Sequence, residues 1–263
     1  MTVLTGETLT DAGIDGIALK PSEVDVRRVR DLDVRRVAVD YEGADHVPPS
    51  DAFASLAEEF DVRATVPVRA DGFDPLGDDG IHSSVPPEVG EVFVAGHPAY
   101  LTEQRERRRA IAPRMSAAID GATDPWIGTE GIERVALATG VTQFELLSDT
   151  TASDVRALRT AGFDGEIAVY APTVLTGDED AILDAVGEYA ARRQPVRESL
   201  PGDAPFDSRA RGDARETLLS GCREYALVGD VSAVRRQVEA FHDAGVDHVV
   251  SYPARGLDAV LPS

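Results

Sequence analysis

Eight residues stand where they could carry chemistry, because each lies at or just beyond the end of a short apolar segment of the chain. Three have side chains suited to proton transfer, namely Lys20, Asp40 and His97. The other five could hold a ligand through charge, aromatic stacking or close backbone approach, and they are Tyr170, Gly229, Asp230, Tyr252 and Arg255. Further polar residues in comparable positions are Glu42, Arg69, Asp71, Ser148, Asp149 and Thr173. Each is weak evidence alone, so the prediction depends on a fold that gathers them.

Lys20 is the only lysine, and every other basic residue among the 26 is arginine. An amine whose pKa is lowered by burial could act as a base or form a Schiff base. An ammonium group could instead pair with Asp40 or with a phosphate of the substrate. A surface lysine without a function is the third interpretation.

His97 follows Gly96 and precedes Pro98, and it could exchange a proton near neutral pH. A packed or solvated loop histidine is the alternative. The other histidines (His46, His82, His242 and His248) show no metal-ligand spacing with one another or with nearby carboxylates. Cys222 is the only cysteine, so the sequence predicts neither a metal site nor an intramolecular disulfide.

The 263-residue chain carries a formal charge of −21, with 43% hydrophobic residues, enough for a buried core. So acidic a surface excludes nucleic acid and anionic membranes as partners. Acidic residues with arginine in place of lysine are typical of a haloarchaeal protein, since molar salt shortens the Debye length to about 3 Å and screens the repulsion. An acidic protein from a GC-rich mesophile is the alternative. Without a spanning segment or signal pattern, we expect a cytoplasmic protein.

One run of arginines stands out in this acidic chain: Arg105, Arg107, Arg108, Arg109 and Arg114. Glu103 and Glu106 are interleaved with them, which favours ion pairs along a helix face or at a subunit contact. A homo-oligomer is therefore left open. Binding of an anion is the alternative for this run.

A repeated pattern reveals the architecture. Residues 11–19, 160–169 and 243–251, and more weakly 138–147, each place a helix-ending glycine ahead of a short apolar strand. Eight strands are predicted, over 16–20, 36–40, 63–68, 91–94, 143–147, 166–170, 224–228 and 248–252. Helical patterns lie between them, over 23–32, 51–60, 102–119, 152–161, 179–193 and 231–244, with Ser50 and Asp230 as N-caps.

This alternation predicts an α/β fold, a single-domain (β/α)8 TIM-like barrel over residues 1–263. One helix is expected to be missing or degenerate, because residues 71–90 are rich in Gly, Pro and Asp. An open doubly wound sheet is the alternative, although no GxGxxG turn follows a strand. Residues 195–213 are predicted to form a lid or insertion, and residues 121–131 around Trp126 a second insertion.

In such barrels the active site lies at the carboxyl ends of the strands, so the eight candidates should share one rim. The turns at 228–230 and 253–256 stand where many barrels hold a phosphate, with Arg255 as its charged partner. A small, phosphate-bearing ligand is the expected partner.

The segment 225–253 resembles the final βαβ unit of the bacterial-luciferase-like superfamily, which includes F420-dependent methylene-tetrahydromethanopterin reductases. Residues 167–172, followed by the acidic run 178–180, resemble the preceding strand and helix of that group. The resemblance covers the C-terminal third of the chain, and only Gly229 and Asp230 align with a family turn. It implies a barrel that binds F420 or a flavin such as FMN and transfers hydride or reacts with oxygen.

Three functions follow from these observations. The first is a luciferase-like oxidoreductase homologue, intact or degenerate. The second is a phosphate-binding barrel lyase or isomerase, with Lys20 as base and Arg255 on the phosphate. The third is a non-catalytic barrel, which a mouth plugged by apolar side chains would favour.

Overall fold

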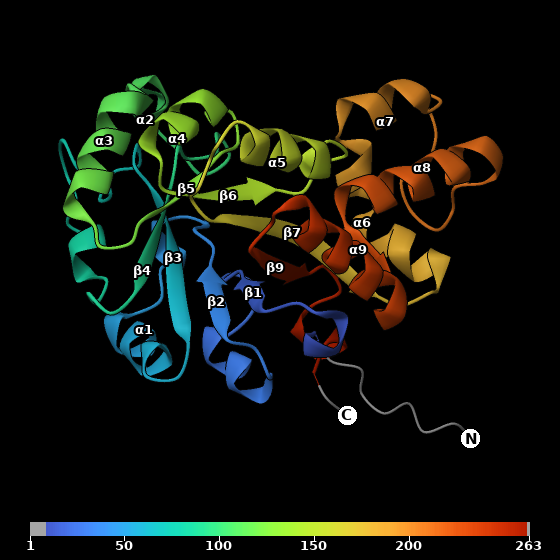
Figure 1. The fold of residues 1–263 in the computed structure, drawn as a ribbon, viewed down its shortest axis with the longest axis horizontal. Helices are drawn as coiled ribbons and strands as arrows, with labels where there is room; N and C mark the ends of the chain where they lie inside the picture. Colours follow the sequence, from blue (N-terminus) through green and yellow to red (C-terminus); the bar gives the residue numbers. More distant parts are fainter. Residues whose placement is uncertain (1–8, 262–263) are drawn as a thin grey trace.

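Eight parallel strands close into a ring in the computed structural model, which describes residues 9–261 (Figure 1). The ring runs β1 to β7 in chain order, then β9, which pairs with both β7 and β1. Its strands are β1 (Gly16–Leu19), β2 (Arg36–Val39), β3 (Asp61–Pro67), β4 (Gly90–Val94), β5 (Trp126–Gly128), β6 (Thr142–Leu146), β7 (Ile167–Leu175) and β9 (His248–Pro253). The predicted α/β barrel is confirmed.

The number of barrel strands is as predicted, but one member differs. The strand expected over 224–228 is β8 (Leu227–Gly229), which pairs with residues 173–175 at the far end of β7 and lies outside the ring. The eighth strand of the ring is instead β5, which lies between β4 and β6 in the segment predicted as an insertion. The prediction of an insertion at residues 121–131 was therefore wrong. β5 has only three residues, too few to form an apolar run in the sequence.

Helices connect the strands. They are α1 (Ser50–Ala57), α2 (Gln104–Arg108), α3 (Ile111–Gly121), α4 (Glu133–Thr139), α5 (Thr151–Thr160), α6 (Glu179–Ala191), α7 (Gln194–Ser199), α8 (Gly212–Tyr225) and α9 (Val231–Ala244). The connection from β3 to β4 holds only a 3₁₀-helix (His82–Ser84), which confirms the degenerate helix, and the helix predicted over 23–32 is also 3₁₀ (Val26–Asp31). Asp230 caps α9 as predicted, whereas the N-cap of α1 is Pro49 rather than Ser50.

Helices α6, α7 and α8 pack together beside the barrel around Leu183, Leu218 and Cys222 (Figure 1). The segment predicted as a lid, 195–213, begins within α7 and ends at the start of α8. Val196 and Ala210 anchor it in the buried cluster, and a Cβ on Gly187 of α6 would lie 2.3 Å from the Phe206 carbonyl oxygen. This close approach ties the segment to α6, and movement as a lid stays a prediction.

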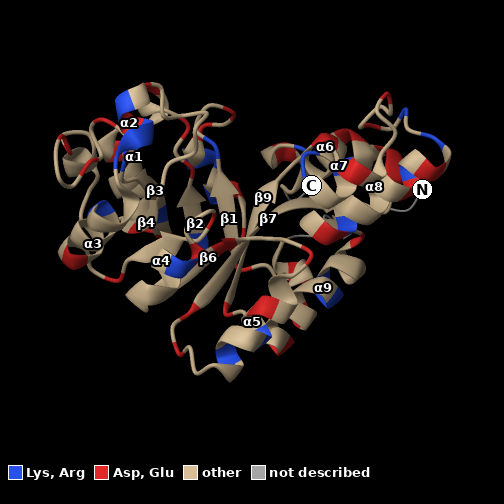
Figure 2. Cartoon of the chain, turned by 90° about the horizontal axis from the view of Figure 1, so that it is seen from above, with Lys and Arg blue, Asp and Glu red and all other residues tan. Residues whose placement is uncertain are grey.

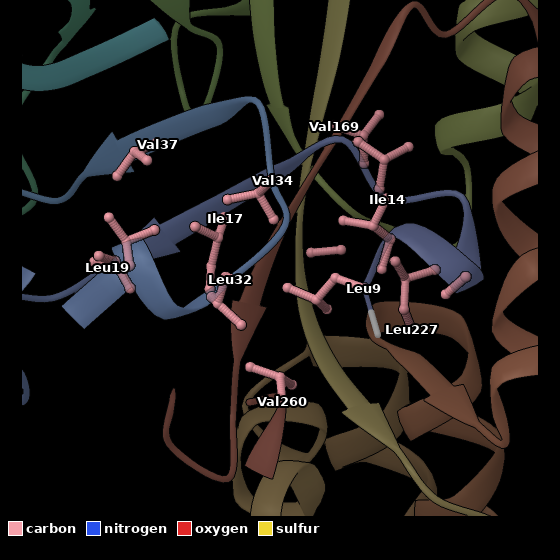
Figure 3. Close-up of a cluster of buried hydrophobic side chains, with 14 of the residues drawn as sticks. Leu9, Ile14, Ile17, Leu19, Leu32, Val34, Val37, Val169, Leu227 and Val260 are labelled. Carbon is pink, nitrogen blue, oxygen red and sulfur yellow. The ribbon is translucent and has the colours of Figure 1, made fainter. Parts of the chain in front are cut away.

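Alternate residues of each strand face the inside of the ring. One buried cluster combines alanines at positions 18, 38 and 168 with Val92, Phe144 and Val250, and it includes Trp126. Ile17 and Leu19 of β1 belong to a separate cluster, in which Leu32 and Val34 lie beside them (Figure 3).

Charged and aromatic side chains close the end of the barrel opposite the mouth. The Arg63 guanidinium lies 4.1 Å from the centre of the buried Trp126 ring, and His248 stacks on that ring at 5.8 Å. Arg36 pairs with Asp61 at 2.7 Å (Nε to Oδ2). His248, at the start of β9, is therefore part of the structural layer.

Acidic residues are spread over the surrounding helices, among them α5 and α6, whereas α2 carries a group of arginines (Figure 2). The predicted pairing of that arginine run along its own helix was wrong, since Arg105, Arg109 and Arg114 pair with Asp71 and Asp74 of the β3–β4 loop. Within residues 9–261, every helix falls short of the length and apolar character that a bilayer crossing requires.

We predict that Trp126→Ala will lower the free energy of unfolding by about 3–5 kcal/mol, because it removes the largest side chain of the closed end and leaves a cavity there. Urea unfolding at fixed KCl concentration measures this, and Trp126→Phe should lose less. Leu76→Ala, at a side chain that is 55% exposed, is the control and should stay within about 0.5 kcal/mol of the unmodified protein. A loss at position 126 no larger than at position 76 would contradict the assignment of β5 to the ring.

Candidate functional site

A cavity of about 460 Å³ opens at the mouth of the barrel, at the carboxyl ends of the strands. It receives side chains from the ends of β1 to β7, so residues distant in the sequence meet there. Among the predicted site residues, Lys20, Asp40, His97 and Tyr170 line it. The mouth is thus open rather than plugged by apolar side chains.

Asp40 and Tyr170 form a hydrogen bond across the mouth. The Tyr170 hydroxyl donates to Asp40 Oδ2 at 2.9 Å, which connects the end of β2 to β7. Burial raises the pKa of Asp40 to about 7, against the opposing effects of this hydrogen bond and of the charge on Lys20. Burial, together with the charge on Asp40, also raises the pKa of Tyr170. Asp40 can therefore hold or release a proton near neutral pH, whereas Tyr170 keeps its own.

Lys20 lies between an aromatic ring and a carboxylate. Its Nζ is 4.3 Å from the centre of the Tyr252 ring and 3.7 Å from Glu23 Oε1, and its side chain is 26% exposed. Tyr252 stacks on Tyr170 at 6.3 Å and donates its hydroxyl to Glu23 Oε2 at 2.7 Å. Tyr252 does not itself line the cavity but contacts two residues that do, Lys20 and Tyr170. Whether Lys20 has a function stays a prediction.

His97 and Arg69 lie on the side of the cavity near β3 and β4. His97 Nδ1 accepts the Ala99 backbone N–H at 3.1 Å, so the neutral ring carries its proton on Nε2. Arg69 donates to the carbonyl oxygens of Ala95 (2.5 Å), Gly96 (2.9 Å) and Arg107 (3.1 Å). Both side chains present N–H donors on the side of the mouth away from Lys20.

The remaining predicted residues, Gly229, Asp230 and Arg255, do not line the cavity. Gly229 ends β8, outside the ring, and the Asp230 carboxylate accepts the Ala233 N–H at 2.7 Å. This hydrogen bond occupies one of the N–H groups at the N-terminus of α9 that would otherwise be available to a bound phosphate. Arg255 follows β9 and is exposed. The phosphate site expected at these two turns therefore stays a prediction, separate from the mouth.

The family of the chain follows from comparison of its sequence with known families. A family described as being of unknown function, DUF7388, matches residues 9–260. The chain belongs to this family. A search of curated proteins gave no match.

Two solved structures have a similar fold. One is the coenzyme F420-dependent tetrahydromethanopterin reductase from Methanopyrus kandleri, with a TM-score of 0.61 and 13% identity over 93% of this chain and 94% of that one. The other is an F420-dependent secondary alcohol dehydrogenase in complex with an F420–acetone adduct, with a TM-score of 0.58 and 13% identity over 92% and 94% of the two chains. At this identity the likeness establishes the barrel fold.

Sequence reasoning missed the cavity residues that follow β5, because it predicted no strand there. Gly128, Thr129 and Glu130 all line the mouth. Gly128 keeps the mouth wide, since a Cβ at this position would lie 2.7 Å from Val94 Cγ1. The short apolar pair Trp126-Ile127 ahead of a glycine was the available signal.

We predict that Gly128→Ala will cost about 1–3 kcal/mol in unfolding free energy, because the added methyl group overlaps the stiff Val94 side chain. Gly121→Ala is the matched control. Its Cβ would meet nothing within 4 Å at the end of α3, so this change should be neutral or stabilise by up to about 1 kcal/mol. Chemical denaturation of both variants provides the comparison, and equal stabilities would show that the mouth has more room at Gly128 than the structure indicates.

Proposed function

We propose that the chain binds a deazaflavin cofactor of the F420 type in the mouth of the barrel and acts as a luciferase-like oxidoreductase. The observation that carries the proposal is the open cavity with the Asp40–Tyr170 pair at its wall. The two solved structures of similar fold are those of F420-dependent enzymes, which supports the choice of cofactor.

The residues of the mouth fit the ring of such a cofactor. Ligand sites are mostly apolar with a few polar groups, and their volumes are about 300–1,000 Å³. The 460 Å³ cavity has apolar walls at Val94, Ile111, Ile132, Phe144 and Leu146, which suit a flat aromatic ring system. The absence of a side chain at Gly128 keeps this space free. FMN has a ring of the same shape and is the alternative cofactor.

When bound, F420 supplies or accepts a hydride at its ring. The chain would contribute the proton chemistry: ionised Asp40 could take a proton from a substrate hydroxyl, and protonated Asp40 could return one to a carbonyl oxygen. The Tyr170 hydroxyl fixes the orientation of the Asp40 carboxylate. Lys20 places a positive charge on the same side of the mouth and favours the ionised form of Asp40.

The other two functions have less support. The lyase or isomerase was predicted with Lys20 as base and Arg255 on the phosphate, but Arg255 and Gly229 are not among the residues that line the mouth with Lys20. A non-catalytic barrel is disfavoured by the open mouth. A haloarchaeal cytoplasm, a homo-oligomer and a phosphate-bearing ligand all remain proposals.

Cofactor binding can be measured directly with protein purified in molar KCl. We expect F420 to bind saturably, with a change in its fluorescence, and to bind more tightly than FMN. Gly128→Leu should abolish binding by filling the mouth, whereas Gly121→Ala should bind like the unmodified chain. Absence of binding by both cofactors would refute the proposal, and tighter binding of FMN would change the cofactor.

The pKa of Asp40 predicts a pH dependence. As a base, Asp40 must be ionised, so oxidation of an alcohol should increase through pH of about 7, and Asp40→Asn should abolish this step. For stability the sign is opposite. A folded-state pKa above the ordinary 3.8 means that folding takes up a proton, so this contribution is complete below about pH 4 and lost as pH rises through 7. Urea unfolding between pH 4 and 8 should show this dependence in the unmodified chain and a weaker one in Asp40→Asn. A variant with the same profile would argue against a perturbed Asp40.

A further inference from the structure

Arg69 differs from the other arginines around it. It follows β3, lines the mouth and donates from Nε, Nη1 and Nη2 to three backbone carbonyl oxygens. Among residues 9–261, no carboxylate lies within ion-pair distance of its guanidinium group, although the chain has 47 acidic residues. The carbonyl bonds fix the group in place without cancelling its charge.

Its neighbours show the usual arrangement. Arg109 pairs with Asp71 at 2.6 Å and with Asp74 at 3.3 Å, and Arg114 pairs with Asp74 at 2.9 Å. Arg105 also pairs with Asp71. These pairs fasten α2 and α3 to the β3–β4 loop and neutralise their charges. Since carboxylates are this close at hand, the lack of one at Arg69 is a specific feature of the mouth.

The guanidinium group still has hydrogen-bond capacity. Arginine has five N–H groups, and three hydrogen bonds leave two without a partner in the described part of the chain. Burial lowers the pKa of Arg69, but an arginine side chain is so strong a base that the group stays charged. A fixed cation with free donors in a partly buried site is suited to a carboxylate or phosphate group, because charge-assisted hydrogen bonds are strongest where water is excluded.

Two acidic residues of the mouth have partners other than Arg69. Glu42 accepts the Ser22 hydroxyl and backbone N–H and receives the Tyr100 hydroxyl at 3.4 Å. Asp40 accepts Tyr170. A third, Glu130, lines the mouth after β5. Within the described residues, the mouth therefore has carboxylates after β2 and β5 and a cation without a carboxylate partner after β3.

We propose that Arg69 binds the anionic group, a carboxylate or a phosphate, of the substrate. The assignment to the substrate rests on the proposed function, in which the cofactor ring occupies the apolar part of the same cavity. A substrate held by Arg69 at one end would direct its hydroxyl or carbonyl group to Asp40. The class expected is a small hydroxy acid, oxo acid or phosphorylated alcohol.

Calorimetric titration with inorganic phosphate and with acetate tests this site at one fixed KCl concentration. Both the cofactor-free chain and the chain saturated with a deazaflavin riboside, which lacks the phosphate and glutamate tail of F420, are titrated. At least one anion should bind in each case, and Arg69→Gln should weaken that binding by about tenfold to a hundredfold. Arg69→Lys should weaken it less, because a charge remains. Arg108→Gln is the control. Arg108 is exposed on α2 and does not line the mouth, so removal of its charge should leave anion binding unchanged.

Four outcomes separate the interpretations. Equal anion binding in Arg69→Gln and the unmodified chain would overturn the proposal, as would absence of anion binding. If Arg69→Gln weakens F420 but not the riboside, and F420 displaces the anion, Arg69 serves the cofactor tail and the assignment to the substrate is wrong. If F420, FMN and the riboside all fail to bind while Arg69 still governs the anion, the cofactor proposal fails and the anion site stands. Should Arg69→Gln unfold, Arg69→Lys gives the same comparison.

Discussion

Closure of the ring between β9 and β1 is the constraint on which the mouth depends. The junction is short, with Gly16 opposite Val250 and Ile17 opposite Ser251. A Cβ on Gly16 would already lie 3.2 Å from Val250 Cγ2, so a small residue is needed for the two strands to approach. Because parallel strands carry their carboxyl ends to one rim, this junction brings Lys20 of the first strand beside Tyr252 of the last. Without it, Lys20 and Tyr252 would lie on the two free edges of an open sheet.

The two ends of the barrel use charge differently. At the closed end the guanidinium groups of Arg36 and Arg63 pair with carboxylates of Asp61 and Asp124 and lie over Trp126, so the charges are compensated within the fold. At the mouth, Arg69 has only carbonyl partners in the described part of the chain, and burial raises the pKa of Asp40 to about 7. Compensated charge stabilises a structure, whereas uncompensated charge in a cavity leaves interaction energy for a ligand.

Most of the ring could be predicted from the sequence, because strands buried on both faces form continuous apolar runs. β5 could not, since three residues carry no periodicity and Trp126 lies beside Pro125. β8 has the same apolar character as a barrel strand, and both β8 and β9 pair with β7, so only the pairing of β9 with β1 decides which of them closes the ring. The rule that the active site of a barrel lies at the carboxyl ends of its strands identified Lys20, Asp40, His97 and Tyr170 as residues of the mouth. It could not show that Arg69 would lack a carboxylate partner, because that depends on distances between side chains far apart in the sequence.

The single tryptophan has a practical consequence. Trp126 is 1% exposed and lies at the end of the barrel away from the mouth, in contact with Arg63 and His248. Its emission is therefore an intrinsic optical reporter from one known depth of the molecule. Changes in that signal in the cofactor-free chain would register loosening of the closed end of the barrel.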